Sequence, residues 1–449
     1  MREVGMGQAE VSAVPARAKQ GTDATGGERR GLWWAEASIW TERMVSALEN
    51  GVKGGKWFSL VDKVIRPATL EAAWQRIARN KGAAGVDGQS TERFATHAER
   101  YLRELQASLA DGSYRPQPVK RVEIPKGDGK TRPLGIPVVK DRIVQAALKM
   151  VIEPIFEVQF RPGSYGFRPG RGCKDALREV DRLLKEGYTH VVDADLKGYF
   201  DSIPHDRLMA LVAGSISDGR VLALIESFLK QDIMKGLERW QPTAGTPQGA
   251  VISPLLANLY LHPLDLLMEQ SGVQMVRYAD DFVLLCRTEA DAQVALRVVA
   301  AWVAENGLTL HPDKTRIGDS REPGKGFDFL GYRFEAGKRL VRKKSLMTLK
   351  DKVRSRTGRS RGVSLERIID DLNPMLRGWF GYFQHAAPGV FSFIDGFVRR
   401  RLRAVLRKQD KRPGIGRCKA DHQRWPNAFF AERGLFTLQT ACAMARHSR

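Results

Sequence analysis

The pattern of hydrophobic and polar positions changes period several times along the chain, which predicts a fold that mixes helices and strands. Apolar residues recur at helical spacing over residues 69–79, 141–156 and 291–305. The first of these segments begins at Thr69, whose side chain is suited to cap a helix. The apolar members of the third segment are Val294, Leu296, Val299 and Trp302. These segments are expected to be amphipathic helices of a shared core.

Two strand-like apolar runs carry acidic residues. Within residues 273–287, β-rich runs flank Tyr278-Ala279-Asp280-Asp281, which predicts a hairpin with the acids at or beside its turn. Residues 191–196 are interrupted by Asp193 and Asp195, which would share one face of a strand. Acids on a buried face need a partner, and a divalent cation with oxygen ligands is suitable. Two-metal sites of this kind act at phosphorus.

Each of these features also has a purely structural interpretation. Asp is common in solvated turns, and Asp193 and Asp195 could cap a loop or pair with Lys197 or a nearby arginine. Spacing alone leaves open which of the two acids would belong to a site. Residues 246–260, taken alone, are a turn followed by a core helix, in which Gly249 permits a close backbone approach.

Taken together and in order, these segments resemble the reverse transcriptase domain of bacterial group II intron-encoded proteins. The order is Asp-Leu-Lys-Gly-Tyr-Phe, then Thr-Pro-Gln-Gly, then Tyr-Ala-Asp-Asp. Further matching segments are residues 80–88, 124–137, 164–172, 307–315, 327–332 and 372–382, the last of which resembles the maturase or thumb region. The resemblance covers most of the chain from about residue 57, and many ordered motifs are more specific than one. One departure is Ala250, where relatives often carry a second glycine.

The resemblance implies an α+β fold of the right-hand polymerase type. Fingers and palm would occupy residues 66–335, with the acids on an antiparallel palm sheet, followed by a helical thumb or maturase (X) domain at 336–395 and a short basic nucleic-acid-binding tail at 396–449. Residues 1–65 would be an N-terminal extension. About the first 32 of these are expected to be disordered. The tryptophans of residues 33–65 either pack on the fingers or contact RNA.

The resemblance also indicates which acids would act. Asp195, Asp280 and Asp281 would be the catalytic residues and would hold two Mg²⁺ ions, for which Mn²⁺ could substitute. Asp193 would be a neighbour rather than a ligand. The expected reaction is attack of a primer 3′-hydroxyl on the α-phosphate of a deoxynucleoside triphosphate, which depends on positioning and charge neutralisation.

Supporting roles follow from the same motif positions. Lys126 and Arg132 resemble the finger residues that clamp the incoming triphosphate. Gln248 resembles a residue that flanks the nucleotide, and Lys314 resembles the lysine near the leaving pyrophosphate. Phe200 matches the bulky side chain that crowds the sugar 2′ position and so favours deoxynucleotides. Without the motif, Phe200 would be a core aromatic and the three cations would be solvated surface residues.

The charge of the chain favours a polyanionic partner. Lys and Arg total 73 against 51 Asp and Glu, a formal net charge of +22, which suits nucleic acid or an anionic membrane surface. A solvated charged helix is the alternative for the basic stretch after residue 336. Trp379 and Phe380 are better explained as thumb core than as residues that stack on bases. The predicted nucleic-acid contacts are Asn80, Lys81, Arg342, Lys343, Lys344, Arg377, Arg399, Arg400 and Arg403.

Several classes of protein are disfavoured by what the sequence lacks. No run approaches membrane-spanning length and the N-terminus has no apolar signal core, which predicts a bacterial cytoplasmic protein with no membrane partner. The four cysteines stand far apart, which argues against a zinc ribbon and against a disulfide framework. Some relatives carry a C-terminal endonuclease, often with Cys pairs, and none is expected here.

The predicted function is that of an RNA-directed DNA polymerase and maturase. It would bind group II intron RNA, assist its splicing and copy it into DNA during retrohoming. Its partners would be intron RNA, an RNA template with a DNA primer, target DNA and deoxynucleoside triphosphates. A splicing factor with an inactive polymerase site is one alternative, and the three acids argue against it. A domesticated reverse transcriptase of phage defence or mutagenesis is another, and the match at residues 372–382 argues against it. A generic basic scaffold leaves the ordered acids unexplained.

Overall fold

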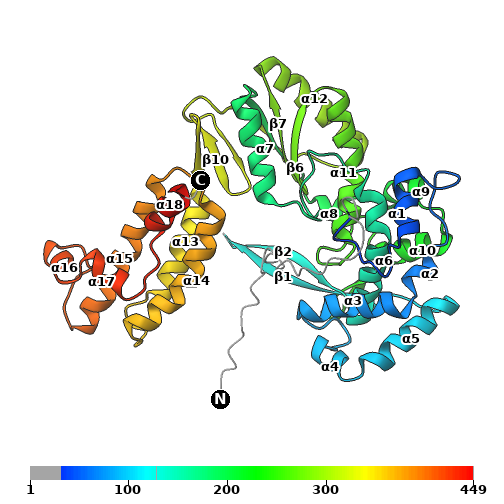
Figure 1. Cartoon of the computed structure of the whole chain (residues 1–449), viewed down its shortest axis with the longest axis horizontal. Coiled ribbons are helices and arrows are strands. Elements are labelled where there is room, and N and C mark those ends of the chain that lie inside the picture. The colour runs from blue at the N-terminus through cyan, green and yellow to red at the C-terminus, as the bar shows by residue number, and fades with distance from the viewer. Residues whose placement is uncertain (1–31, 128, 448–449) are drawn as a thin grey trace.

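The computed structural model describes residues 32–127 and 129–447. Helices and antiparallel strands are arranged in three lobes, which Figure 1 shows as fingers at lower right, a palm at the top and a helical thumb at the left. This confirms the predicted α+β class. The sequence predicts disorder for about the first 32 residues. Of these, only Leu32 lies within the described ranges.

The fingers combine helices with a long hairpin. Their elements are α1 (Glu42–Asn50), α2 (Val61–Val64), α3 (Pro67–Arg79), α4 (Thr91–Ala95), α5 (Ala98–Asp111), β1 (Val119–Gly127), β2 (Lys130–Ile136) and α6 (Val139–Glu157). The strands β4 (Ile233–Lys235) and β5 (Glu238–Trp240) extend the sheet in the order β2-β1-β4-β5. The hairpin of β1 and β2 reaches from this lobe toward the thumb (Figure 1).

The palm is a four-stranded antiparallel sheet in the order β6-β7-β3-β8. Its strands are β3 (His190–Asp195), β6 (Gln274–Tyr278), β7 (Asp281–Cys286) and β8 (Arg316–Asp319). The accompanying helices are α7 (Cys173–Lys185), α8 (Tyr199–Ser202), α9 (His205–Ser215), α10 (Gly219–Leu229), α11 (Ser253–Gln270) and α12 (Glu289–Glu305). Because strand residues alternate between faces, Val192 and Ala194 enter the large core with α11 and α12, while Asp193 and Asp195 lie on the opposite face.

The thumb follows a small sheet in the order β11-β10-β9, formed by β9 (Phe327–Phe329), β10 (Tyr332–Glu335) and β11 (Lys338–Val341). Its helices are α13 (Lys343–Arg356), α14 (Leu365–Phe383), α15 (Gly389–Gln409), α16 (Lys419–Arg424), α17 (Asn427–Glu432) and α18 (Leu438–His447). The predicted division at residues 395 and 396 falls inside α15. Leu402, Leu438 and Cys442 share one apolar core with α14, so the C-terminal residues are part of the thumb rather than a separate tail.

Three details differ from the sequence-based expectations or resolve them. Pro67 occupies the first turn of α3, so Thr69 lies buried inside the helix and does not cap it. Val294 is half exposed, because α12 turns the small residues Ala292 and Ala295 toward the sheet instead. Trp40 is buried, and its indole Nε1 donates to the carbonyl of Met150 at 3.1 Å, so this tryptophan packs on the fingers.

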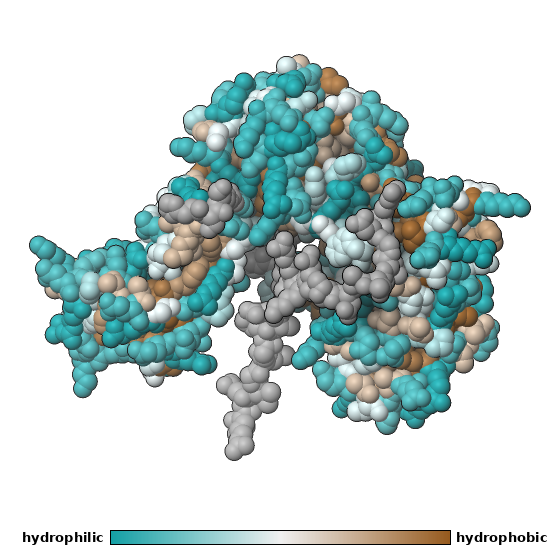
Figure 2. All heavy atoms as spheres, in the orientation of Figure 1, coloured by the Kyte–Doolittle hydropathy of each residue, from teal (hydrophilic) through white to brown (hydrophobic). Residues whose placement is uncertain are grey.

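The surface is mostly polar. Figure 2 shows hydrophilic side chains over much of the visible face of all three lobes. Among the helices in residues 32–127 and 129–447, none combines the length and apolar character needed to cross a membrane. The four cysteines all lie in these ranges, and none is disulfide-bonded.

Candidate functional site

The palm sheet brings the predicted acids together through its register. Asp195, the last residue of β3, lies directly opposite Asp281, the first residue of β7. Asp280 lies in the two-residue turn that joins β6 to β7, which confirms the predicted hairpin. Residues opposite each other on antiparallel strands point to the same face, so Asp195 and Asp281 share the face opposite α11 and α12. Asp193 lies on this face one pleat farther from the turn.

The carboxylates are close enough to affect one another. Burial raises the pKa of Asp281 to about 7, because its charge loses hydration there. The negative charges of Asp193, Asp195 and Asp280 act in the same direction, whereas the guanidinium of Arg342 opposes them. Burial likewise raises the pKa of Asp193 to about 6. Burial therefore disfavours the charged forms of Asp193 and Asp281, and at Asp281 the neighbouring negative charges add to that effect.

Two basic side chains neutralise part of that charge. The ammonium Nζ of Lys314 lies 2.5 Å from Oδ2 of Asp195. The guanidinium of Arg316, on β8, lies 3.5 Å from Oδ2 of Asp193. Asp193 therefore has the arginine partner that a structural role requires, and Asp195 is paired with the lysine predicted to lie beside the pyrophosphate.

The donor set suits a hard divalent cation by its chemistry. All three predicted ligands offer carboxylate oxygens, which Mg²⁺ prefers, and a cation would offset both the burial of the Asp281 charge and its repulsion by the neighbouring acids. Within residues 32–127 and 129–447, no three His, Cys, Asp or Glu side chains already converge on a single metal position. Binding would accordingly require side-chain adjustment, including movement of the Lys314 ammonium away from Asp195.

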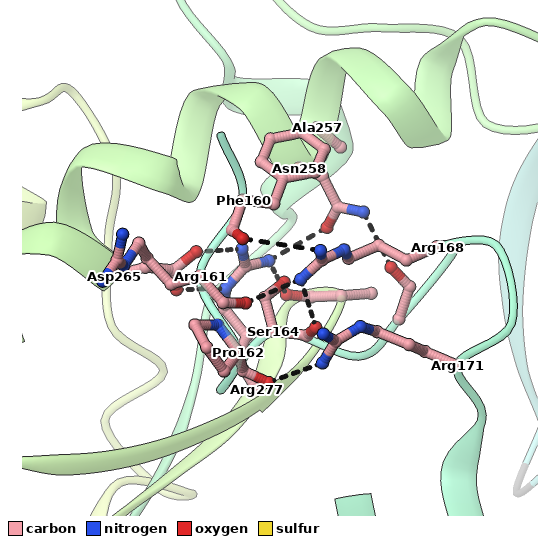
Figure 3. A network of polar contacts seen from close by, with 12 residues as sticks. Phe160, Arg161, Pro162, Ser164, Arg168, Arg171, Ala257, Asn258, Asp265 and Arg277 are labelled. Atoms are coloured by element: carbon pink, nitrogen blue, oxygen red, sulfur yellow. Dashed lines mark hydrogen bonds and ion pairs between the residues drawn. The ribbon is translucent and has the colours of Figure 1, made fainter. Parts of the chain in front are cut away.

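The turn that carries Asp280 is held by a buried arginine, Arg277, whose role the sequence pattern does not reveal. Arg277, on β6, is fully buried and pairs with both carboxylate oxygens of Asp265, at 2.7 and 2.5 Å. Its Nη1 also donates to Oδ1 of Asn258 and to the carbonyl of Ala279, each at 3.0 Å. Figure 3 shows the Arg277 side chain beside Asp265 and Asn258. Although burial alone lowers the pKa of Arg277, the charge of Asp265 raises it above its ordinary value.

This network fixes an unusual backbone conformation. Ala279 has a φ of 60°, a left-handed value that favours glycine. Gly166 lies directly against it, since a Cβ on Gly166 would be 2.2 Å from the amide nitrogen of Ala279. The amide of Asn258 donates to the carbonyl of Gly166 at 2.7 Å, so one buried side chain links both segments. In the sequence, Arg277 stands in an apolar strand and Asp265 in an apolar helix, and each is unusual there. The sequence does not show that the two side chains pair with each other.

Backbone hydrogen bonds fix two of the segments that carry the predicted nucleotide residues. Phe200 lies on α8, and its carbonyl accepts from the amide of Thr246 at 2.6 Å. The carbonyl of Gln248 accepts from the amide of Gly135 at 2.6 Å, which joins this loop to the base of the finger hairpin. Gly249 permits that contact, because a Cβ there would lie 2.4 Å from the carbonyl of Gly135. Backbone hydrogen bonds therefore hold the segments of Phe200 and Gln248 in place.

The finger cations lie farther out on the same hairpin. Arg132 is exposed on β2 and pairs in register with Ile124 on β1. Lys126 lies on β1 beyond that pair. The hairpin thus places both positions on one projecting element, whose base contacts the Gln248 loop.

The predicted nucleic-acid contacts divide into three groups. Exposed residues include Asn80, Lys81, Lys343, Lys344 and Arg377, and half-buried ones are Arg399 and Arg400. Arg342 is exposed, but its Nε lies 2.9 Å from Oδ2 of Asp328. The prediction that Arg403 contacts nucleic acid is wrong. Arg403 is only 2% exposed, and its guanidinium donates to the carbonyl of Trp425 and to Oδ1 of Asn427. Its charge is used inside the thumb and is not presented to nucleic acid.

The raised pKa of Asp281, caused mainly by burial and secondly by the neighbouring acids, predicts a measurable effect on stability in metal-free protein. The folded-state pKa of about 7 exceeds the ordinary value of 3.8. The protonated Asp281 side chain therefore contributes its full stability below the ordinary pKa of 3.8. That contribution is lost as the pH rises through the folded-state pKa of about 7. An Asp281→Asn variant in chelator is expected to melt a few degrees above wild type at about pH 8, with a smaller difference at about pH 5. Equal melting temperatures at about pH 8 would contradict this.

The geometry of this site defines a class of protein. Carboxylates that face each other across adjacent antiparallel strands, with a finger hairpin on one side and a helical thumb on the other, are the arrangement of a right-hand nucleic acid polymerase. The family model described as reverse transcriptase (RNA-dependent DNA polymerase) matches residues 124–334. The model of the group II intron maturase-specific domain matches residues 346–425. The chain belongs to the reverse transcriptase family and carries a group II intron maturase domain, which confirms the resemblance.

The chain is also similar to individual proteins and to a solved structure. Protein YkfC of Escherichia coli is 37% identical over 328 residues, which cover 64% of this chain and 84% of that protein. The group II intron-encoded protein LtrA of Lactococcus lactis is 40% identical over 205 residues, covering 45% of this chain and 34% of that protein. A solved chain of a partial Cas6-RT-Cas1--Cas2 complex is 27% identical, covers 55% of this chain and 41% of its own length, and has a TM-score of 0.35. Reverse transcriptases use divalent metal ions.

Proposed function

We propose that this protein is an RNA-directed DNA polymerase and maturase that binds group II intron RNA, assists its splicing and copies it into DNA during retrohoming. The observation that carries the polymerase part is the register of Asp195 with Asp281 beside the Asp280 turn. The maturase part rests on the domain match over residues 346–425. The partners would be intron RNA, a DNA primer on an RNA template, target DNA and deoxynucleoside triphosphates.

Asp195, Asp280 and Asp281 would hold two Mg²⁺ ions, which supply the positive charge that attack at phosphorus requires. Asp281 must release its proton for this, and its pKa of about 7 indicates that it binds that proton more tightly than an ordinary carboxyl. Lys314 pairs with Asp195, and its ammonium would move to the leaving pyrophosphate as metal binds. Arg132 and Lys126 on the finger hairpin would hold the triphosphate, and Gln248 would flank the nucleotide.

Phe200 would set the preference for deoxynucleotides. Its backbone is fixed by the hydrogen bond from Thr246, and Gly245 packs so closely that a Cβ there would lie 2.8 Å from the Phe200 carbonyl. The bulk of this side chain beside the sugar would exclude a 2′-hydroxyl and so favour deoxynucleotides.

The proposal is tested by primer extension on an RNA template with Mg²⁺ and deoxynucleotides, with an Asp280→Ala variant as control. Activity that disappears in the control supports the polymerase and its acidic site together. A folded wild type that binds intron RNA and promotes splicing, yet extends no primer, would indicate instead a splicing factor with an inactive polymerase site.

RNA binding by the thumb is expected to depend steeply on salt. Each basic side chain that contacts a phosphate releases counterions, so six to ten such contacts predict a loss of about 10³-fold or more in affinity between about 50 and 200 mM salt. A Lys343→Ala/Lys344→Ala variant should lower the slope of log affinity against log salt by about 1 for each phosphate that it no longer neutralises. The control is Arg103→Ala, an exposed cation on the finger helix α5. An unchanged slope in the double variant would contradict the assignment of α13.

A further inference from the structure

Phe167 combines two properties that seldom occur together in an aromatic residue. Its φ is 59°, a left-handed backbone conformation that a bulky side chain adopts only under constraint. Its side chain is nevertheless 46% exposed, so burial of the ring accounts for only part of what holds the residue there. Strained backbone of this kind is concentrated at functional sites.

The constraint comes from both neighbours of Phe167. Gly166 is pressed against Ala279 of the catalytic turn, and its carbonyl accepts from Asn258. Arg168 is buried, donates to the carbonyl of Ser164 at 2.8 Å and pairs with Glu157 at 2.8 Å. With both flanking residues anchored, the backbone at Phe167 has little freedom to relax (the contact between Arg168 and Ser164 is visible in Figure 3).

The ring of Phe167 joins two residues of the candidate site. Its centroid lies 6.4 Å from that of Phe200 in a perpendicular, edge-to-face arrangement. It lies 6.5 Å from the ring of Tyr278, the residue that opens the catalytic turn. Such aromatic pairs are mutually stabilising at these separations. Phe167 is therefore the aromatic link between the residue expected to exclude the 2′-hydroxyl and the turn that carries Asp280.

We propose that Phe167 is a specificity-determining residue of the nucleotide site, which braces the Phe200 ring and presents its exposed face to the sugar of the reacting nucleotide. The inference rests on the proposed polymerase function and deepens it. Removing the brace would let the Phe200 ring move aside, and a ribonucleotide would then be accepted more readily. The effect would appear in the choice of sugar rather than in folding.

The test compares single-nucleotide incorporation of deoxy- and ribonucleotides by wild type and by Phe167→Ala, Phe167→Gly and Phe167→Tyr. The expected result is a rise of about 10-fold in the ratio of ribonucleotide to deoxynucleotide kcat/KM for Ala and Gly, and little change for Tyr. Phe167→Gly also relieves the left-handed strain, so its melting temperature should not fall below that of Phe167→Ala. Phe58→Ala, an exposed phenylalanine outside the palm, is the control.

The outcomes of this test are distinguishable. An altered sugar ratio in a Phe167→Gly protein that melts like wild type supports the inference, because a structural role would not move that ratio. An unchanged ratio in Ala and Gly variants that still extend primers would overturn it. A wild type that extends no primer with deoxynucleotides would overturn the proposed function itself, and the inference with it.

Discussion

An Asp195→Asn variant is expected to lose primer extension by a factor of about 10³ or more while remaining folded. The amide has nearly the same shape as the carboxylate, so the pairing of β3 with β7 at Asp281 is retained. What it loses is the negative charge that would hold a cation at the reacting phosphate. The Lys314 ammonium also loses its ion-pair partner, a contact of small energetic value because the lysine is about half exposed. Single-nucleotide incorporation in Mg²⁺, with melting temperature and RNA affinity measured in parallel, checks this.

Asp193→Asn is the matched control for Asp195. It makes the same chemical change two residues earlier on the same face, where the carboxylate pairs with Arg316 and lies opposite Val283 rather than an acid. We expect a modest loss of activity from altered electrostatics, well short of that at Asp195. If Asp193→Asn were inactive and Asp195→Asn active, the two assignments would have to be exchanged.

The strand pattern was sufficient to place the acids, because it depends on local geometry. Alternation along β3 puts Asp193 and Asp195 on one face, and the β-rich runs around Asp280 define a hairpin, whatever the rest of the chain does. What the pattern could not give was the choice between Asp193 and Asp195. That choice came from the resemblance, and the structure adds that Asp195 is the one opposite Asp281.

Long-range polar contacts explain what the sequence left hidden. Arg403 belongs to a basic run and was expected to face nucleic acid, yet it points into the thumb because Trp425 and Asn427, on segments that follow α15, supply acceptors. Arg277 and Asp265 are 12 residues apart, and nothing local marks them as partners. A charged side chain becomes internal only where distant segments satisfy it, and single-sequence patterns carry no record of that.

The Arg277 network also separates two roles that are usually confused, stability and positioning. Arg277→Met leaves the Asp265 carboxylate buried without its partner, which is expected to cost about 3–5 kcal/mol of stability. The double variant Arg277→Met/Asp265→Leu removes both charges and should recover much of that loss, since apolar replacements of buried pairs are often neutral. Its activity should nevertheless stay about 100-fold below wild type, because the Ala279 carbonyl still lacks the donor that fixes the Asp280 turn.

Melting curves and single-nucleotide kcat values for wild type and these two variants show whether the Arg277 network stabilises the fold, positions the Asp280 turn, or does both. The control pair is Arg407→Met/Asp421→Leu, which removes a largely buried ion pair of 2.6 Å in the thumb, away from the turn. The stability of this control variant should change about as much as that of Arg277→Met/Asp265→Leu, while its rate of nucleotide addition should stay at the wild-type level. A double variant at Arg277 and Asp265 that regained both stability and full rate would show that the network serves the fold alone. Recovery of stability without rate would instead mean that a buried arginine, which touches no substrate, determines where the catalytic carboxylate stands.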